Sequence, residues 1–252
     1  MKAFALFAVL LMCFNFMVFA DEKGSKDPKE KKEPKIVDFT FIKTKVEPFY
    51  DSEGLKINIG RYSKDFAISD DKKFVEAIFK IKENWANLTV EELFVGAIRL
   101  YDMEYRDEAV YWFYSAQFRA KVYQGSLEQP KAEKMGDASF DLQQVQKDFF
   151  KATGQYINGY AFRSIDKVGK VIDRVNKESE ALADMTKIYP NVTFIEASKQ
   201  KEVVVVTVDG LVKVSKMLVE KREEIKKMRS ENGIDLKFTL LKNKEFAKPK
   251  EE

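Results

Sequence analysis

From about residue 70 onward, apolar residues recur every three or four positions, which is the spacing of one face of an α-helix. Signals for helix ends fall beside these segments, such as Ser69-Asp70-Asp71 before the first and Asn232-Gly233 after the last. The pattern predicts one helix behind Asp70, a second that begins at Thr89, a third over 107–123 and a fourth over 139–153 that ends at Gly154. A fifth helix would carry Ile165, Val168, Ile172, Val175 and Leu182. The last would run through Leu211, Val214, Leu218, Ile225 and Met228.

A period of two appears only before residue 60. Ile36–Val46 alternates imperfectly and 55–59 alternates cleanly, with a turn region at Pro48–Gly54 between them. This arrangement is typical of a β-hairpin. The run Val203–Val206 is too short for periodicity to decide between a strand and the first turns of a helix. The predicted fold is therefore mainly α, a bundle of helical hairpins with a small N-terminal β-hairpin.

Residues 89–123 predict two helices joined by a tight turn. Thr89 and Glu92 match a capping box at the start of the first helix. Small residues at 97, 109 and 116 would let the two axes approach closely, and large apolar residues would fill the space between them. In this spacing the segment resembles one tetratricopeptide or Sel1-like repeat, which implies a helical hairpin and a role in binding a partner. The positions that carry the resemblance are Leu93, Ala97, Leu100, Ala109, Phe113 and Ala116.

The second of these helices is rich in aromatic residues. Residues 111–114 read Tyr-Trp-Phe-Tyr, and four consecutive helical positions point in every direction. One interpretation places Trp112 and Phe113 in the core, with Tyr111 and Tyr114 at helix seams and their hydroxyls outward. The other is an aromatic binding surface, since Tyr, Trp and Arg are enriched at interface hot spots. The candidate partner contacts are Tyr105, Arg106, Tyr111, Tyr114 and Arg119.

The N-terminus has the layout of a secretory signal peptide. Residues 1–20 hold Lys2, an apolar stretch and a Val-Phe-Ala end. An uncleaved anchor and a lipoprotein modified at Cys13 are the alternatives. Residues 21–35 have 11 charged positions of 15 and predict a disordered tether. A single domain is then expected at 36–245, with a loose tail at 246–252. The rest of the chain resembles exported bacterial proteins that have no assigned role.

Composition excludes several chemistries. The chain has 252 residues with 44 Lys+Arg against 41 Asp+Glu, a net charge of +3, no histidine, and one cysteine, Cys13. Histidine-dependent nucleophiles and ordinary zinc, haem or iron–sulfur sites are therefore not expected. No cofactor or metal is predicted. The basic stretch 213–229 is balanced by glutamates, which argues against nucleic acid as a partner and against membrane insertion once the signal segment is removed.

Two catalytic arrangements survive these exclusions. Four acids at the hairpin turn could supply the carboxylate pair of a hydrolase, although acids also favour first helical turns. Ser164 and Lys167 match a Ser-x-x-Lys spacing. The function favoured is nevertheless a non-catalytic protein-binding module, exported to the periplasm or outside the cell. It would be an adaptor or scaffold, or alternatively an immunity or inhibitor protein that neutralises an exported toxin. The four acids are Asp102, Glu104, Asp107 and Glu108.

Overall fold

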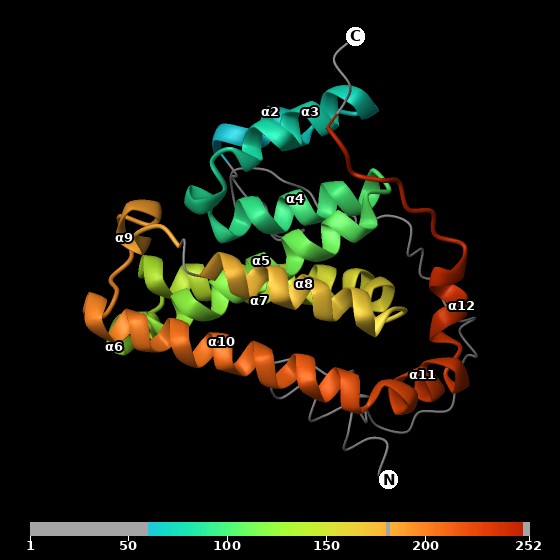
Figure 1. Cartoon of the computed structure of the whole chain (residues 1–252). Coiled ribbons are helices and arrows are strands. Elements are labelled where there is room, and N and C mark those ends of the chain that lie inside the picture. Colours follow the sequence, from blue (N-terminus) through green and yellow to red (C-terminus); the bar gives the residue numbers. More distant parts are fainter. Residues whose placement is uncertain (1–59, 180–181, 249–252) are drawn as a thin grey trace, which may run out of the picture.

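The computed structural model describes residues 60–179 and 182–248, and this part of the chain is helical (Figure 1). Its β-structure is limited to one isolated antiparallel bridge between Leu127 and Phe194. The mainly helical class is therefore confirmed, whereas the predicted hairpin before residue 60 lies outside the described residues. The helices before the centre of the chain are η1 Gly60–Tyr62, α2 Ser63–Phe66, α3 Asp71–Lys82, η2 Trp85–Asn87, α4 Val90–Asp102 and α5 Arg106–Gly125. Those after it are α6 Gln129–Ala132, α7 Ala138–Ala161, α8 Ile165–Glu178, α9 Met185–Ile188, α10 Ala197–Glu220, α11 Arg222–Glu231 and α12 Ile234–Thr239.

Helix α5 is the centre of the fold. It packs against α4, α7, α8 and α10, which surround it on different sides (Figure 1). Tyr111, Trp112, Phe113 and Tyr114 are all buried, although they point in four directions. A helix that is apolar all round can be stable only when other elements cover it on every side. The aromatic run is thus the reason that α5 lies inside the bundle.

Helices α4 and α5 form the antiparallel hairpin that the sequence predicts. The Thr89–Glu92 capping box is present at the start of α4, with both hydrogen bonds made. Gly96 marks the closest approach, because the Trp112 ring lies where a Cβ at position 96 would be. The six small and large residues that carry the repeat resemblance are all fully buried: Leu93, Ala97, Leu100, Ala109, Phe113 and Ala116.

Two expectations about helix boundaries are corrected, and one that the sequence leaves open is settled. Helix α7 passes through Gly154 and ends at Ala161, because Ile157, Tyr160 and Ala161 continue its buried face. Val203–Val206 is helical and belongs to α10. Helix α8 ends at Glu178, so Leu182 lies beyond it.

The C-terminal helices wrap the bundle. α10 runs along one side, the helix breaks at Lys221, and α11 leads to α12 through Gly233, whose φ of 62° is left-handed (Figure 1). The helix end predicted at Asn232-Gly233 is confirmed. Phe238 anchors α12 to α7, since its ring covers Gly159.

After α12 the chain returns across the α4–α5 turn to α3. The Lys244 amide donates to the Glu104 carbonyl at 2.8 Å, and the Lys244 ammonium pairs with Asp71 at 2.7 Å. The ring of Phe246 stacks on Phe79 with centroids 4.8 Å apart. The predicted loose tail is therefore corrected at its first residue, because stacking on α3 fixes Phe246.

Candidate functional site

The five predicted partner contacts do not form an exposed surface. Tyr105, Arg106, Tyr111, Tyr114 and Arg119 are each at most 5% exposed. Their hydroxyls and guanidinium groups are used inside the protein, because α5 is covered by other helices. Exposure of these side chains to a partner is therefore corrected, and each has a structural role.

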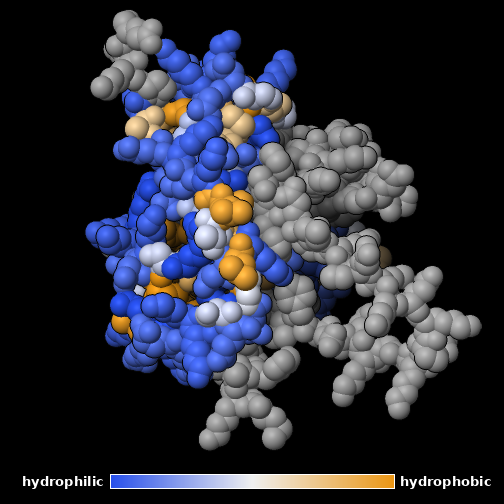
Figure 2. All heavy atoms as spheres, turned by 90° about the vertical axis from the view of Figure 1, so that its right-hand side faces the viewer, coloured by the Kyte–Doolittle hydropathy of each residue, from blue (hydrophilic) through white to orange (hydrophobic). Residues whose placement is uncertain are grey.

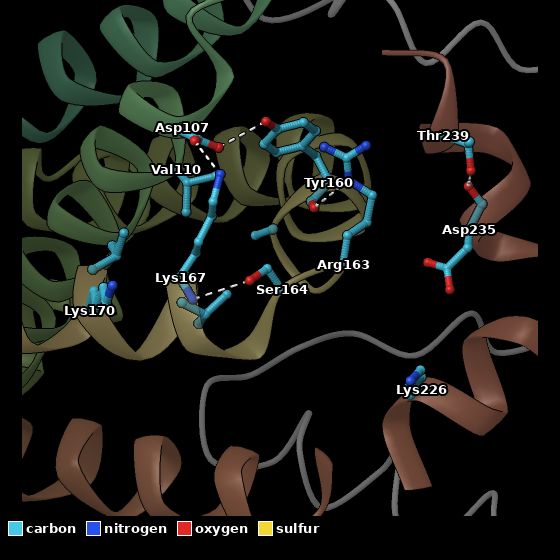
Figure 3. A pocket seen from close by; sticks show the side chains of 13 residues that line it. Asp107, Val110, Tyr160, Arg163, Ser164, Lys167, Lys170, Lys226, Asp235 and Thr239 are labelled. Atoms are coloured by element: carbon cyan, nitrogen blue, oxygen red, sulfur yellow. Dashed lines mark hydrogen bonds and ion pairs between the residues drawn. The ribbon is translucent and has the colours of Figure 1, made fainter. Parts of the chain in front are cut away.

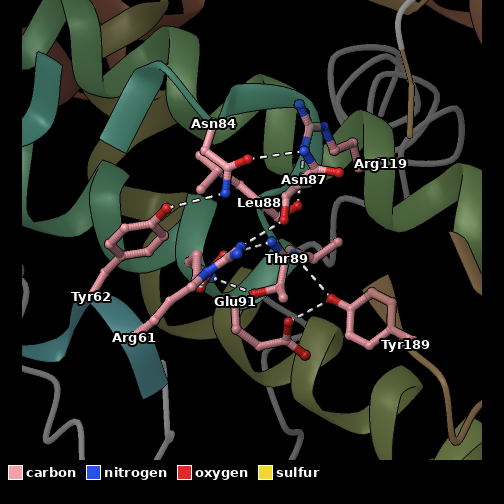
Figure 4. A network of polar contacts seen from close by, with 11 residues as sticks. Arg61, Tyr62, Asn84, Asn87, Leu88, Thr89, Glu91, Arg119 and Tyr189 are labelled. Carbon is pink, nitrogen blue, oxygen red and sulfur yellow. Dashed lines mark hydrogen bonds and ion pairs between the residues drawn. The ribbon is translucent and has the colours of Figure 1, made fainter. Parts of the chain in front are cut away.

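Arg119 closes the turn that follows α3. Its guanidinium donates at 2.9 Å to the carbonyl of Trp85, the first residue of η2. It also donates at 3.0 Å to the carbonyl of Leu88, which follows η2 (Figure 4). Burial lowers the pKa of Arg119. The nearby network continues through Arg61, which forms two hydrogen bonds with Glu92 at 2.9 Å. These contacts fix the entry to α4.

Tyr111 belongs to a cluster around Glu178. The Tyr111 ring stacks on Trp85 at 5.1 Å, and Glu178 accepts hydrogen bonds from both side chains. The Arg174 guanidinium lies 3.3 Å from the centroid of the Tyr111 ring. Burial and the hydrogen bond to Glu178 raise the pKa of the Tyr111 hydroxyl.

The other three predicted partner contacts, Tyr114, Tyr105 and Arg106, link α5 and its N-terminal turn to neighbouring elements. The Tyr114 hydroxyl donates to Asn158 of α7 at 3.0 Å, and the Tyr105 hydroxyl donates to Asp71 of α3 at 2.8 Å. The Arg106 guanidinium donates to the Lys242 carbonyl of the C-terminal segment. Tyr111 and Tyr114 therefore lie at helix seams as one interpretation held, but their hydroxyls bond inward.

The acids at the hairpin turn point to different neighbours. Asp107 pairs with Lys167 at 2.6 Å and accepts from the Tyr160 hydroxyl at 2.8 Å. Glu108 pairs with Lys82 at 2.7 Å and accepts from the Trp112 indole at 3.1 Å. Of the four acids considered, Asp107 is the one that lines a cleft of the described chain.

This cleft lies between the start of α8 and the α11–α12 corner and has a volume of about 670 Å³ (Figure 3). Asp107 and Val110 of α5 and Tyr160 of α7 form one wall. Asp235 and Thr239 of α12 form the other. The side of the molecule that carries α12 is mostly hydrophilic, with apolar side chains visible within a hollow and in a small raised group (Figure 2). Leu236 of α12 and Leu240, which follows that helix, are both exposed.

The cleft holds an excess of positive charge. Arg163, Lys167, Lys170 and Lys226 line it, against Asp107 and Asp235. Both acids are already in ion pairs, Asp107 with Lys167 and Asp235 with Arg229 at 2.6 Å. Within the described chain, the other three cations have no carboxylate partner. Arg163 donates to backbone carbonyls, and Lys170 and Lys226 extend from exposed positions.

The Ser-x-x-Lys motif lies in this cleft but is used as a helix start. The Ser164 hydroxyl oxygen accepts from the Lys167 amide at 3.4 Å and caps α8, while the Lys167 ammonium turns to Asp107 (Figure 3). The sequence holds only part of the signal for the cleft, since Lys167 and Lys170 lie one turn apart on α8 whereas Arg163 precedes that helix. The cleft was not recognised because the other wall comes from residues 226–239.

Comparison with known proteins gives one informative match. A Haemophilus influenzae protein described only as uncharacterized is 28% identical over 172 aligned positions, which cover 66% of this chain. The match spans 64% of that protein's length. No family model matches the chain, so the tetratricopeptide or Sel1-like resemblance stays a prediction. No solved structure matches it either.

Two features of the described residues bear on metal binding and on membranes. Among residues 60–179 and 182–248, no group of His, Cys, Asp and Glu is arranged to hold a metal ion. None of the helices in the same ranges combines the length and the apolar character that crossing a bilayer requires.

Proposed function

We propose that this protein is an exported, non-catalytic protein-binding module, and that the cleft between α8 and α12 receives an acidic segment of its partner. The observation that carries the proposal is the set of three cleft cations that have no carboxylate partner among residues 60–179 and 182–248, namely Arg163, Lys170 and Lys226. A partner's carboxylates would complete the charges that the cleft leaves unbalanced, and such complementarity governs encounter and specificity.

The shape of the cleft supports a peptide-like ligand. Its volume of about 670 Å³ is in the range of ligand pockets, and it is open to solvent. Leu236 and Leu240 are exposed, and each follows a residue of the cleft wall, Asp235 and Thr239, in the sequence. An acidic segment with an apolar residue at its end would match both features.

A titration with a defined probe tests this proposal. The probe is a fluorescent deca-glutamate peptide, and a deca-glutamine peptide of the same length is the comparison. The full chain should raise the anisotropy of the acidic peptide alone. The Lys170→Glu/Lys226→Glu variant should bind it on the order of tenfold more weakly, which corresponds to about 1.4 kcal/mol.

The matched control is Lys73→Glu/Lys80→Glu, which makes the same charge change on exposed positions of α3 outside the cleft. This control should bind as the wild type does. Equal loss in both variants would mean that only net charge matters, and no binding by the wild type would contradict the cleft proposal.

An adaptor and an immunity protein would differ in the number of partners that they bind. A pull-down from the exported fraction should give several partners for an adaptor and one partner in a one-to-one ratio for an immunity protein. In either case the cleft variant should lose the partner that the α3 control keeps. Partners retained by both would place the binding site elsewhere.

A further inference from the structure

Helix α10 has two apolar faces, and the bundle uses one of them. Leu211, Val214 and Leu218 are buried against α5 and α8. Away from this buried face, α10 carries four valines that are exposed to solvent: Val205 at 60%, Val206 at 69%, Val212 at 37% and Val219 at 52%.

Three of these valines form a stripe along the helix. Val205, Val212 and Val219 are seven residues apart, so they recur on one face every two turns. At a rise of about 1.5 Å per residue the stripe is about 21 Å long. β-branched residues lower helix propensity, and more than a third of each of these side chains is exposed to solvent. An exposed apolar stripe of this kind marks a surface that another molecule covers.

Two charged residues between the valines indicate which molecule covers the stripe. Asp209 lies between the first two valines and Lys216 between the last two, and both are exposed. Neither is in an ion pair with another residue of the described chain. The stripe therefore reads valine, acid, valine, base, valine, and its two halves carry opposite charges about Val212.

This order of charges along the stripe is complementary to its own reverse. If two α10 helices lie antiparallel about a two-fold axis at Val212, Val205 of one copy comes level with Val219 of the other. Asp209 then lies within one residue, about 1.5 Å of rise, of Lys216 of the second copy. A parallel arrangement would instead place like charges opposite each other, Asp209 on Asp209 and Lys216 on Lys216.

We infer that the outer face of α10 is a self-association surface, where a second copy of this chain docks antiparallel through Val205, Val212 and Val219, with Asp209 of each copy paired to Lys216 of the other. Such an interface is isologous, as in most two-fold dimers. It is separate from the α8–α12 cleft, since no α10 residue lines that cleft.

A charge swap followed by sedimentation velocity tests the inference on the purified full chain. The wild type should sediment as a dimer at about 100 µM and dissociate on dilution. Asp209→Lys alone and Lys216→Asp alone should each weaken the dimer at least tenfold, because each places like charges together twice. The double variant Asp209→Lys/Lys216→Asp should restore association to near the wild-type level.

A second measurement tests the register. In a Cys13→Ser background, Val212→Cys places two thiols at the axis and should form a disulfide-linked dimer under mild oxidation. Val205→Cys should link to Val219→Cys when the two variants are mixed and not to itself. A wild type that is monomeric at all concentrations would overturn the inference. So would a dimer that neither single charge change weakens. The acidic-peptide titration does not depend on either result.

Discussion

Single residues set how closely the helices of this bundle approach. At Gly96 an added Cβ would lie 2.3 Å from the Trp112 ring, which is itself fully buried. Gly96→Ala should therefore force the α4–α5 hairpin apart and cost about 1–3 kcal/mol of the free energy of unfolding, the range of an overpacked core. Urea denaturation of the purified variant measures this loss.

Gly210 provides the matched control, because nothing lies within 4 Å of its Cβ position on α10. An alanine there removes the backbone entropy cost of a helical glycine. Gly210→Ala should stabilise the protein by about 0.5–1 kcal/mol. Equal effects at positions 96 and 210 would contradict the close packing of Trp112 on α4.

Glu91 should make the stability of the protein depend on pH. It accepts a hydrogen bond from the Tyr189 hydroxyl at 2.5 Å, and burial raises the pKa of its carboxyl. A folded pKa above the unfolded one gives stability that is present below the unfolded pKa and is lost as pH rises through the folded pKa. Glu91→Gln carries no charge at any pH, so it escapes this loss.

The melting temperature of Glu91→Gln relative to the wild type should therefore rise between about pH 4 and pH 7. Thermal denaturation at four or five pH values measures the difference. A difference that stays constant over this interval, or falls, would show that burial does not govern the Glu91 carboxyl.

The positions of single residues also explain why the predicted partner contacts are buried rather than exposed. Residues 111–114 must face four directions on any helix, but the sequence does not state how many helices surround them. Tyr114 meets α7 and Tyr111 meets α3 and α8, and these partners lie 29 to 67 positions away. Only the long-range packing decides whether such side chains are seams or contacts.

At the scale of elements, local sequence signals predict most helix starts correctly. They misplace helix ends where packing against the core extends the helix past a local stop signal. Thr89 and Asp70 cap α4 and α3 as predicted, because a cap needs only its own first turn. Gly154 carries the usual signal for a helix end, yet α7 continues because its later residues pack on the core. The cleft was missed for the same reason, since its two walls are distant in sequence.

Helix α12 is the element on which the cleft depends. Phe238 is buried over Gly159, and both Phe238→Ala and Gly159→Ala should release it, the first by removing the ring and the second by displacing it. We expect hydrogen exchange in residues 234–239 to speed up on the order of tenfold in each variant, which corresponds to about 1.4 kcal/mol of local stability.

The acidic peptide should bind more weakly to both variants, because Asp235 and Thr239 of α12 form one wall of the cleft. Leu236→Ala is the control for hydrogen exchange alone, since this side chain is exposed on the same helix. It should leave the exchange rate of α12 unchanged. Faster exchange with unchanged peptide binding would separate α12 from the binding site.

For the whole molecule, the cleft and the outer face of α10 are useful only where partners can reach them, so the compartment matters. Residues 1–20 and the change to charged sequence at Asp21 predict export with cleavage after Ala20. The intact mass of the protein recovered from its exported fraction should then equal that of residues 21–252. Lys2→Glu should reduce the exported amount, because the basic start of a signal segment is needed for its orientation. Lys23→Glu, which makes the same change just after the cleavage point, is the control. A mass that includes Met1 in a membrane fraction would instead establish the anchored form, and the same mass in the cytoplasm would contradict export.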